Sequence, residues 1–386
     1  MIEIYNKSKC CGCHACFNKC PKNAIEMIED EQGFKYPKIN KEKCINCGLC
    51  EKVCPIININ QKQNQPIAYA CYNLNETIRE ESSSGGIFSL LSEWILDKNG
   101  VVFGAAFNDE FLVQHTYIEN MSDLKKFRGS KYLQSLINDT YKKAKEFLDN
   151  GRYVLFTGTP CQIEGLMSYL GKKYEKLYTQ DIICHSNPSP KVWKKYLEYL
   201  EKQSNSKLEN VNFRDKSLEG WSNYHLKVKF KTGSEYNSIH SKDKYMKIFL
   251  NSLSSRESCY ECHFRKLNRV SDITLADFWG IDNILPKMND EKGTSLVIIN
   301  SYKGKELFDA IQKDIKCENV DINAALKYNP AIINSPQKNK NREKFFCNLD
   351  TMEFDELVKK YVPRTNILQK VKNKCKKILK RVLVKK

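Results

Sequence analysis

Residues 10–21 read CCGCHACFNKCP, and residues 44–55 read CINCGLCEKVCP. Both stretches follow the pattern C-x-x-C-x-x-C-x-x-x-C-P, and the second begins 34 residues after the first. In each run, three cysteines are spaced closely enough for a tight loop to bring their thiols together. A fourth cysteine directly precedes a proline. A pattern of four cysteines that occurs twice in this way decides the fold of the N-terminal part of the chain.

Runs of this pattern are typical of two-cluster bacterial ferredoxins, in which the fourth cysteine of each run ligates the other cluster. We therefore predict a dicluster 4Fe–4S ferredoxin domain over residues 1–60. Cys11 fits the spacing less well than its neighbours and is left unassigned. Zinc, or disulfides in a secreted domain, are the alternatives. The predicted ligands are Cys10, Cys13, Cys16 and Cys54 for one cluster, and Cys44, Cys47, Cys50 and Cys20 for the other.

The overall composition indicates a redox protein of a reducing compartment. The chain has 386 residues, enough for a small domain and a large one, and 17 of them are cysteines. The start, MIEIYNKSK, is polar, unlike a signal peptide. No apolar stretch approaches the roughly eighteen residues of a membrane span. We expect a cytoplasmic protein whose cysteines serve metal and redox chemistry instead of disulfides.

The formal charge of +17 is concentrated near the C-terminus, where residues 337–386 hold 16 Lys and Arg against 5 Asp and Glu. No motif of a nucleic-acid-binding fold accompanies this charge, so we predict no nucleic-acid partner. Apolar residues in the last segment recur on one helical face between basic ones, which predicts a basic amphipathic helix within a tail at 336–386. One hypothesis is that this helix contacts the inner membrane face. The alternative is a helix docked on the protein's own core, or a partly disordered tail.

Residues 67–335 alternate predicted strands and helices, which is typical of an α/β domain. Strands are expected at 67–72, 101–107, 111–118, 153–157, 177–184 and 295–300, and helices at 86–98, 139–148 and 160–170. Segments after residue 208 are expected to add antiparallel strands. The predicted fold class is therefore α+β / α/β: a ferredoxin domain, a larger α/β domain and a basic C-terminal helix.

Four further cysteines are candidates for a third metal site. Cys161 is expected in the first turn of a helix, and Cys184 at the end of a strand, positions at which α/β sheets bind ligands. Cys259 and Cys262 form a C-x-x-C pair. Together the four thiols could hold a third cluster or a structural zinc. The alternative is two separate buried thiols and a cysteine pair without partners.

Two loops of small residues are candidates for binding a phosphate or the polar edge of a ring. Ser82–Gly86 reads SSSGG and is expected between a strand and a helix, and Arg128–Tyr132 reads RGSKY. Backbone N–H groups and hydroxyls in such loops can bind an anion. From the residues of either loop alone, an ordinary turn is the better explanation.

The motifs taken together, and in their order, resemble the coenzyme F-420 hydrogenase/dehydrogenase beta-subunit family over about residues 67–330. They are SSSGGIFS (82–89), RGSKY (128–132), GTPCQIEGL (158–166), CHSNPS (184–189), CYECHF (259–264) and SDITLADFWGI (271–281).

The resemblance implies a flavoprotein that passes electrons between iron–sulfur clusters and FAD, and on to a deazaflavin or another acceptor. It also implies that Cys161, Cys184, Cys259 and Cys262 hold a third 4Fe–4S cluster, and it gives Asp277 no clear role. The chain departs from the family at Ser186 and Asn187, where a glycine is expected. The flavin-contacting positions implied by the resemblance are Ser84, Gly85, Gly86, Lys131, Gly158 and Thr159.

These observations predict an oxidoreductase that takes electrons from an external one-electron donor, such as ferredoxin or a partner redox subunit. The acceptor is expected to be a deazaflavin or a substrate such as a polysaccharide-pathway intermediate. His185 is a candidate proton donor, with a hydrogen-bonding role near a cluster as the alternative. The competing hypothesis is an electron-transfer subunit that serves a separate reductase or hydrogenase and has no substrate of its own.

Overall fold

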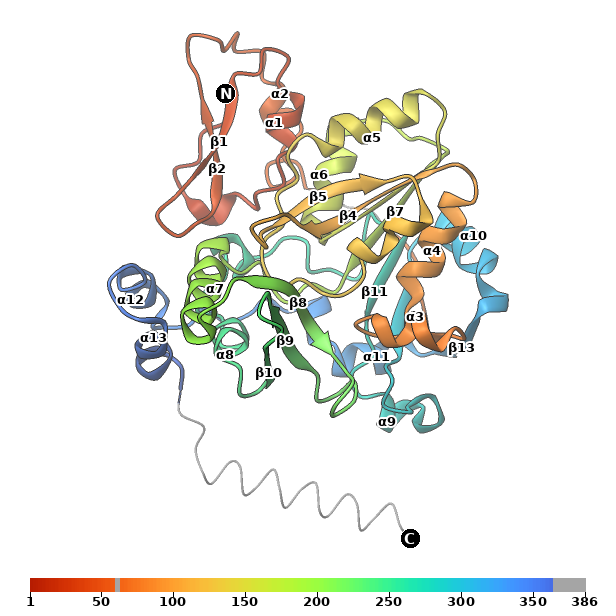
Figure 1. Ribbon diagram of the computed structural model, residues 1–386. Helices are drawn as coiled ribbons and strands as arrows, with labels where there is room; N and C mark the ends of the chain where they lie inside the picture. Colours follow the sequence, from red (N-terminus) through yellow and green to blue (C-terminus); the bar gives the residue numbers. More distant parts are fainter. Residues whose placement is uncertain (60–62, 364–386) are drawn as a thin grey trace.

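The computed structural model describes residues 1–59 and 63–363 (Figure 1). Its N-terminal unit contains the antiparallel hairpin of β1 (Ile25–Glu29) and β2 (Lys35–Ile39), which joins the two cysteine runs. A short helix lies within each run: α1 (Ala15–Lys19) in the first and α2 (Leu49–Lys52) in the second. The repeat in the sequence is thus also a repeat in the structure.

The body of the protein is built on an eight-stranded mixed sheet in the order β13-β3-β12-β11-β7-β6-β4-β5. Strands β4, β6, β7 and β11 run parallel, and the strands at both edges are antiparallel to their neighbours. In chain order these strands are β3 (Ile67–Asn73), β4 (Val101–Phe107), β5 (Val113–Ile118), β6 (Val154–Gly158), β7 (Leu177–Ile182), β11 (Ile273–Asp277), β12 (Ser295–Ile299) and β13 (Ile315–Val320).

Helices cover both faces of this sheet, because its central strands are apolar on both sides. On one face, Val102 and Leu155 pack with α4 (Ile87–Leu96) and α10 (Tyr302–Ala310). On the other, Phe103 and Phe156 pack with α5 (Thr140–Asp149) and α6 (Pro160–Leu170). Figure 1 shows α5 and α6 beside the N-terminal unit.

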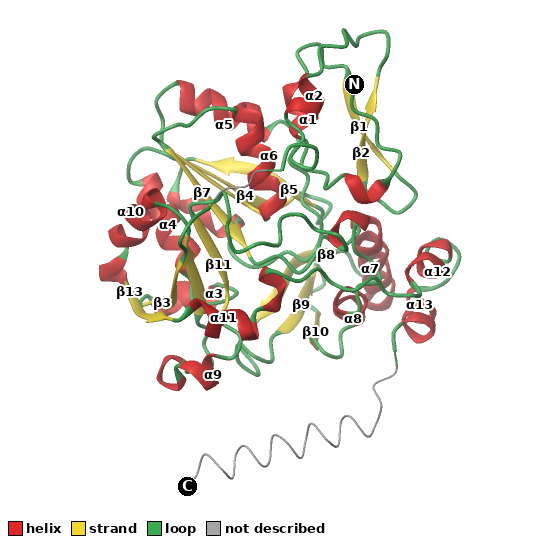
Figure 2. Ribbon diagram, turned by 180° about the vertical axis from the view of Figure 1, so that it is seen from behind, coloured by secondary structure: helices red, strands yellow, loops and turns green. Residues whose placement is uncertain are grey.

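A second sheet, in the order β10-β9-β8, is entirely antiparallel. It shares a hydrophobic core with four helices from two distant parts of the sequence, and Figure 2 shows these helices beside the sheet. The strands are β8 (Leu208–Asp215), β9 (His225–Phe230) and β10 (Glu235–Ile239), and the helices are α7 (Pro190–Ser204), α8 (Lys244–Leu250), α12 (Arg342–Cys347) and α13 (Phe354–Tyr361).

The predicted fold class is confirmed: a small ferredoxin-like unit precedes a larger mixed α/β body. Two local expectations were wrong. Helix α3 (Glu76–Glu81) separates β3 from the SSSGG loop, and β7 ends two residues before Cys184. The first part of the predicted tail forms α12 and α13, whose Phe345 and Leu357 are buried in the core. The rest of that tail, with the predicted basic helix, lies outside the described residues.

The N-terminal unit packs against the body through α1 and α6. Gly165 of α6 makes the approach possible, because a Cβ at this position would lie 2.8 Å from the Cβ of Cys13. Asn18 Nδ2 also donates to the Asn138 carbonyl at 2.7 Å, and Lys19 Nζ donates to the Tyr169 carbonyl at 2.9 Å. Within residues 1–59 and 63–363, no helix is both long and apolar enough to cross a membrane.

Candidate functional site

The two cysteine loops of the N-terminal unit bend in the same way. Gly12 and His14 have φ values of 70° and 60°, and Asn46 and Gly48, at the matching positions of the second run, have 53° and 71°. These left-handed residues turn the chain back between successive cysteines, so that the thiols of one loop face a common point. Glycine and asparagine are the residues that adopt this conformation most readily.

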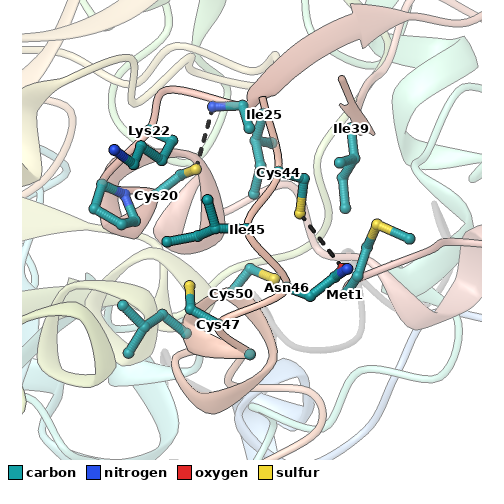
Figure 3. A pocket seen from close by; sticks show the side chains of 14 residues that line it. Met1, Cys20, Lys22, Ile25, Ile39, Cys44, Ile45, Asn46, Cys47 and Cys50 are labelled. Atoms are coloured by element: carbon teal, nitrogen blue, oxygen red, sulfur yellow. Dashed lines mark hydrogen bonds between the residues drawn. The ribbon is translucent and has the colours of Figure 1, made fainter. Parts of the chain in front are cut away.

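Cys20, Cys44, Cys47 and Cys50 line one small cavity (Figure 3). Cys20 comes from the first run and the other three from the second, which is the grouping that a crossed ligand assignment requires. The Ala24 backbone N–H donates to Cys20 Sγ at 3.2 Å, and Cys44 Sγ contacts Asn46 Oδ1 at 3.8 Å. The side chain of Cys47 is exposed, so this set of thiols lies at the protein surface.

Cys10, Cys13, Cys16 and Cys54 are buried, with exposed fractions of 8–9%. Burial raises the pKa of the Cys16 thiol, and the charges of Cys10 and Cys54 raise it further. Thiols that disfavour one another's ionised form in this way fit a bound cation or cluster, which replaces their protons. The set therefore suits an anionic thiolate site that is withdrawn from solvent.

The body brings Cys161, Cys184, Cys259 and Cys262 together from separate segments of the chain. Burial raises the pKa of the Cys184 thiol, and the charges of Cys259, Cys161 and Cys262 all act on it. The Asn187 backbone N–H donates to Cys259 Sγ at 3.3 Å. Cys161 lies in the first turn of α6, as predicted, after a capping box of Thr159 and Gln162.

The four thiols of this set thus share one neighbourhood and fit a thiolate-ligated cluster. In the described part of the chain, no three His, Cys, Asp or Glu side chains form a group suited to a single metal ion.

A cavity of about 440 Å³ lies where β6, β7 and β11 end. Ser84, Gly86, Lys131, Gly158 and Thr159, five of the six residues expected at a flavin, line it. Cys184 and His185 line it as well, so the third set of thiols adjoins this cavity.

Gly85, the sixth expected flavin residue, is not among the residues that line the cavity. Its backbone N–H donates to Ser295 Oγ at 2.9 Å, and its carbonyl accepts from the Asn73 backbone N–H at 2.7 Å. A Cβ here would lie 2.5 Å from the Cys71 carbonyl oxygen. Glycine at this position therefore allows the SSSGG loop to lie directly on β3 and β12.

Lys131 carries a cation in the cavity wall. Its Nζ donates to the carbonyls of Phe127, Arg128 and Gly129 at 3.2–3.4 Å. Burial lowers the pKa of Lys131 to about 8. The ammonium group is thus still charged near neutral pH, and an anion in the cavity would be attracted by its charge or would replace one of these carbonyls.

An ion pair of Arg214 and Asp277 joins the two sheets across the cavity. The guanidinium donates to both carboxylate oxygens at 2.9 and 3.0 Å, and to the Ser83 carbonyl at 3.1 Å. Trp221 Nε1 also donates to Asp277, at 2.8 Å. Asp277 therefore has the role that its motif left open, which is to hold Arg214.

The Arg214 side chain is 1% exposed, and its Nε is buried without a hydrogen-bond partner. An unpaired buried donor in a cavity wall is costly unless a ligand satisfies it. This donor, Lys131 and the SSSGG loop together fit a large cofactor with acceptor atoms, as a flavin has. Arg214 has no signal of its own in the sequence, because the surrounding NVNFRD shows only an alternating strand pattern.

Two histidines of the cavity wall are held neutral. His115 Nε2 lies 2.9 Å from the Thr157 carbonyl, so it carries the hydrogen, and Nδ1 accepts from Ser135 at 2.6 Å. Burial lowers the pKa of His115 to about 4. Burial, and then the charge of Arg265, also lower the pKa of His185. Neither ring is therefore a ready source of protons at neutral pH.

Comparison with known proteins found a matching family model for each of the two parts of the chain. Residues 9–57 match the family model described as a 4Fe-4S dicluster domain. Residues 151–325 match the model that describes the C terminus of the beta subunit of coenzyme F420 hydrogenase/dehydrogenase. No curated protein matches the sequence.

Among solved structures, the chain is similar to one from the F420-reducing [NiFe] hydrogenase complex of Methanosarcina barkeri, studied by xenon derivatization. The two chains share 16% sequence identity, with a TM-score of 0.48, over 74% of this chain and 92% of the other.

The N-terminal fold, its eight cysteines and the matching family model define an iron–sulfur protein of the electron-transfer class. Residues 151–325 of the body are similar to the beta subunits of coenzyme F420 hydrogenase/dehydrogenase, and the 4Fe-4S dicluster domain lies on their N-terminal side.

Proposed function

We propose that the protein is an iron–sulfur flavoprotein oxidoreductase that passes electrons between three 4Fe–4S clusters, FAD and an organic acceptor. The observation that carries the proposal is the position of Cys184. It belongs to the third set of thiols and also lines the cavity of Ser84, Gly86 and Lys131. A cluster on this set would therefore adjoin whatever the cavity binds.

The three sets of thiols extend from the surface to the cavity. The set at Cys20, Cys44, Cys47 and Cys50 is the outermost, and the set of Cys10 and its partners is buried. Between that buried set and the third lies Cys11, whose thiol interacts with Cys13 on one side and with Cys161 on the other. This spatial order of the three sets of thiols, from the surface to the cavity, supports electron exchange between the surface of the dicluster domain and the body.

The external donor is proposed to be a one-electron carrier such as ferredoxin or a partner redox subunit, which would meet the exposed side of the dicluster domain. Cys47 is exposed there, and Ile45 beside it is 57% exposed. In the cavity, FAD would supply the conversion between one-electron and two-electron chemistry. The chain's own residues would bind it: the SSSGG loop and Lys131 at its polar groups, and Arg214 through its free Nε.

The acceptor is proposed to be a deazaflavin or another organic molecule that enters the same cavity. Its volume of about 440 Å³ falls within the roughly 300–1,000 Å³ of small-molecule and cofactor sites. Because His115 and His185 are neutral, their part would be to position groups by hydrogen bonding and ring contact.

The first test is the iron, acid-labile sulfide, zinc and flavin content of anaerobically purified protein. We expect about twelve iron atoms and one FAD per chain, the content of three cubanes and a flavin. About eight iron atoms without flavin would overturn the third cluster and the flavin site. Turnover by the isolated chain with reduced ferredoxin would separate an enzyme from an electron-transfer subunit.

A matched pair of variants sharpens this test. Cys184→Ser is expected to remove about four iron atoms, the content of one cubane, and to leave the dicluster domain intact. Cys347→Ser, an exposed position on helix α12 and outside all three sets, is the control and should leave the iron content unchanged. Equal iron content in both variants would contradict a cluster at Cys184.

A further inference from the structure

Arg256 lies at the junction between the dicluster domain and the body, and its side chain is 0% exposed. Its Nε donates to the Cys10 carbonyl at 2.8 Å. Nη2 donates to the Lys35 carbonyl at 3.0 Å and lies 3.5 Å from Cys10 Sγ. The guanidinium of a body residue thus reaches the backbone and the thiol of a predicted cluster ligand.

Arg256 is held firmly in this position. Nη1 donates to Gln134 Oε1 at 3.1 Å, and the Tyr36 ring centroid lies 4.1 Å from the guanidinium carbon. Gly12 leaves the necessary space, because a Cβ there would lie 3.0 Å from the guanidinium carbon of Arg256. A fixed donor of this kind has a planar fork that lysine cannot reproduce.

Within the described residues, Arg256 makes no ion pair with a carboxylate, in contrast to the equally buried Arg342, which pairs with Glu257. A buried charge is costly unless it is paired. The groups around Arg256 that can carry negative charge include the thiols of Cys10, Cys11, Cys161 and Cys259 and the Tyr36 hydroxyl. A cluster on thiolates at Cys10 would supply the missing anion.

We propose that Arg256 is a positioning residue that raises the reduction potential of the cluster held by Cys10, Cys13, Cys16 and Cys54. The inference rests on the proposed function, since it presumes that this cluster is present. Reduction adds negative charge to a thiolate-ligated cluster, and a fixed cation with an N–H···S hydrogen bond stabilises the reduced state more than the oxidised one. Hydrogen bonds to sulfur and local charge are among the factors that set cluster potentials.

The position of Arg256 gives this effect a consequence for electron flow. Burial disfavours the more negative, reduced state of the inner cluster, whereas the outer set near exposed Cys47 is stabilised by water. Without a compensating cation, electrons would therefore collect on the outer cluster. Arg256 offsets this difference in reduction potential between the inner and the outer cluster. It therefore favours electron transfer inward, toward Cys161 and the cavity.

The test compares Arg256→Met with Arg342→Met in the full chain, by redox titration followed by electron paramagnetic resonance. The signal that Cys54→Ser alters identifies the inner cluster. In Arg256→Met the reduced-to-oxidised ratio of this cluster at a fixed potential should fall at least tenfold, which is about 59 mV for one electron. The outer cluster serves as an internal reference and should not shift.

Arg342→Met is the matched control, because it removes an equally buried cation whose partner Glu257 still pairs with Lys338. It should leave both potentials unchanged. An unchanged inner potential in Arg256→Met, or an equal shift in Arg342→Met, would overturn the proposal. If iron is bound and no shift is seen, the inference about Arg256 fails while the proposed function stands; absence of iron would refute the function itself.

A measurement on the wild-type protein keeps the proposal testable if Arg256→Met loses its inner cluster. Protein labelled with ¹⁵N-arginine should show a nitrogen coupling to the reduced inner cluster in electron–nuclear double resonance. Arg256→Lys should lose this coupling and have a potential between those of the wild type and the methionine variant. No ¹⁵N coupling in the wild type would overturn the contact between Arg256 and the cluster.

Discussion

Lys131 is a residue whose charge state can be followed by pH. Its pKa is lowered by burial to about 8, so the cation is lost as pH rises through that value, well below the ordinary 10.5. If Lys131 contacts a phosphate or another anionic group of FAD, the dissociation constant should rise about tenfold between pH 7 and pH 9.5, in line with about 1.5 kcal/mol for a hydrogen bond to a charged group. Fluorescence titration of the flavin-free protein with FAD measures this change.

Lys131→Met should bind FAD weakly at both pH values and so remove the pH dependence. Lys125→Met is the control, because Lys125 is exposed on a neighbouring turn and does not line the cavity. A pH dependence that survives in Lys131→Met would show that another group titrates.

Arg214 is predicted to stabilise both the fold and the cofactor site. Arg214→Met would leave the Asp277 carboxylate without its guanidinium, and breaking a buried ion pair costs about 3–5 kcal/mol. Thermal unfolding of the cofactor-free protein should therefore shift to lower temperature. Arg152→Met, which breaks the more exposed pair with Glu119, should cost about 1 kcal/mol or less.

The double variant Arg214→Met/Asp277→Asn separates the two roles of Arg214. It removes the unpaired carboxylate and should recover much of the lost stability, but FAD affinity should stay low because the free Nε is gone. Recovery of both properties would mean that Arg214 acts only by supporting the fold.

At the residue scale, the sequence predicted the residues whose signal is local. Cysteines at fixed spacing reveal ligand sets, and capping residues such as Thr159 place Cys161 in the first turn of its helix. Arg214 and Arg256 carry no such signal, because their partners at Ser83 and Cys10 are 131 and 246 residues away in the sequence. Only the folded chain shows which cations are buried and what they contact.

Helix α6 is the element on which the dicluster domain rests, and Gly165 is its point of closest contact. Gly165→Ala should favour the isolated helix by about 1 kcal/mol. In the protein, the added methyl group would lie 2.8 Å from Cys13 Cβ and 2.9 Å from the Tyr141 hydroxyl oxygen. We therefore expect net destabilisation and a loss of iron, measured by thermal unfolding and iron content.

Ser168→Ala, on the same helix and half-buried, provides the control for helix propensity. It should retain the wild-type iron content. If Gly165→Ala also retained its iron and its stability, the contact between α6 and the Cys10–Cys16 loop would be looser than the structure has it.

At the element scale, the sequence identified most strands and helices but not the order of the sheet. Buried runs such as 101–107 and 295–299 are legible as strands from composition alone. That β12 lies between β3 and β11, antiparallel to both, depends in part on contacts between residues more than 200 positions apart. The sequence did not predict helices α12 and α13, because the few apolar residues through which they pack on the core are interspersed with basic surface residues.

At the scale of the whole molecule, the described core is complete without the last segment of the chain. Tyr361, at the end of α13, already belongs to the core shared by α7, α8 and α12. Residues 364–386 hold ten Lys and Arg and no Asp or Glu, more than half of the net charge of +17. The residues that form the described core and the residues that carry most of the net charge are therefore in different parts of the chain.

Deletion of residues 364–386 should leave thermal stability, iron content and flavin content unchanged. The full chain should co-sediment with vesicles of anionic lipid, since each basic residue near such a surface contributes about 1 kcal/mol before screening. The deleted chain should remain in the supernatant, and added salt should release the full chain, because salt screens exposed charges. Equal vesicle binding by both chains would contradict membrane contact through this segment, and a loss of stability on deletion would instead indicate that the segment docks on the protein's own core.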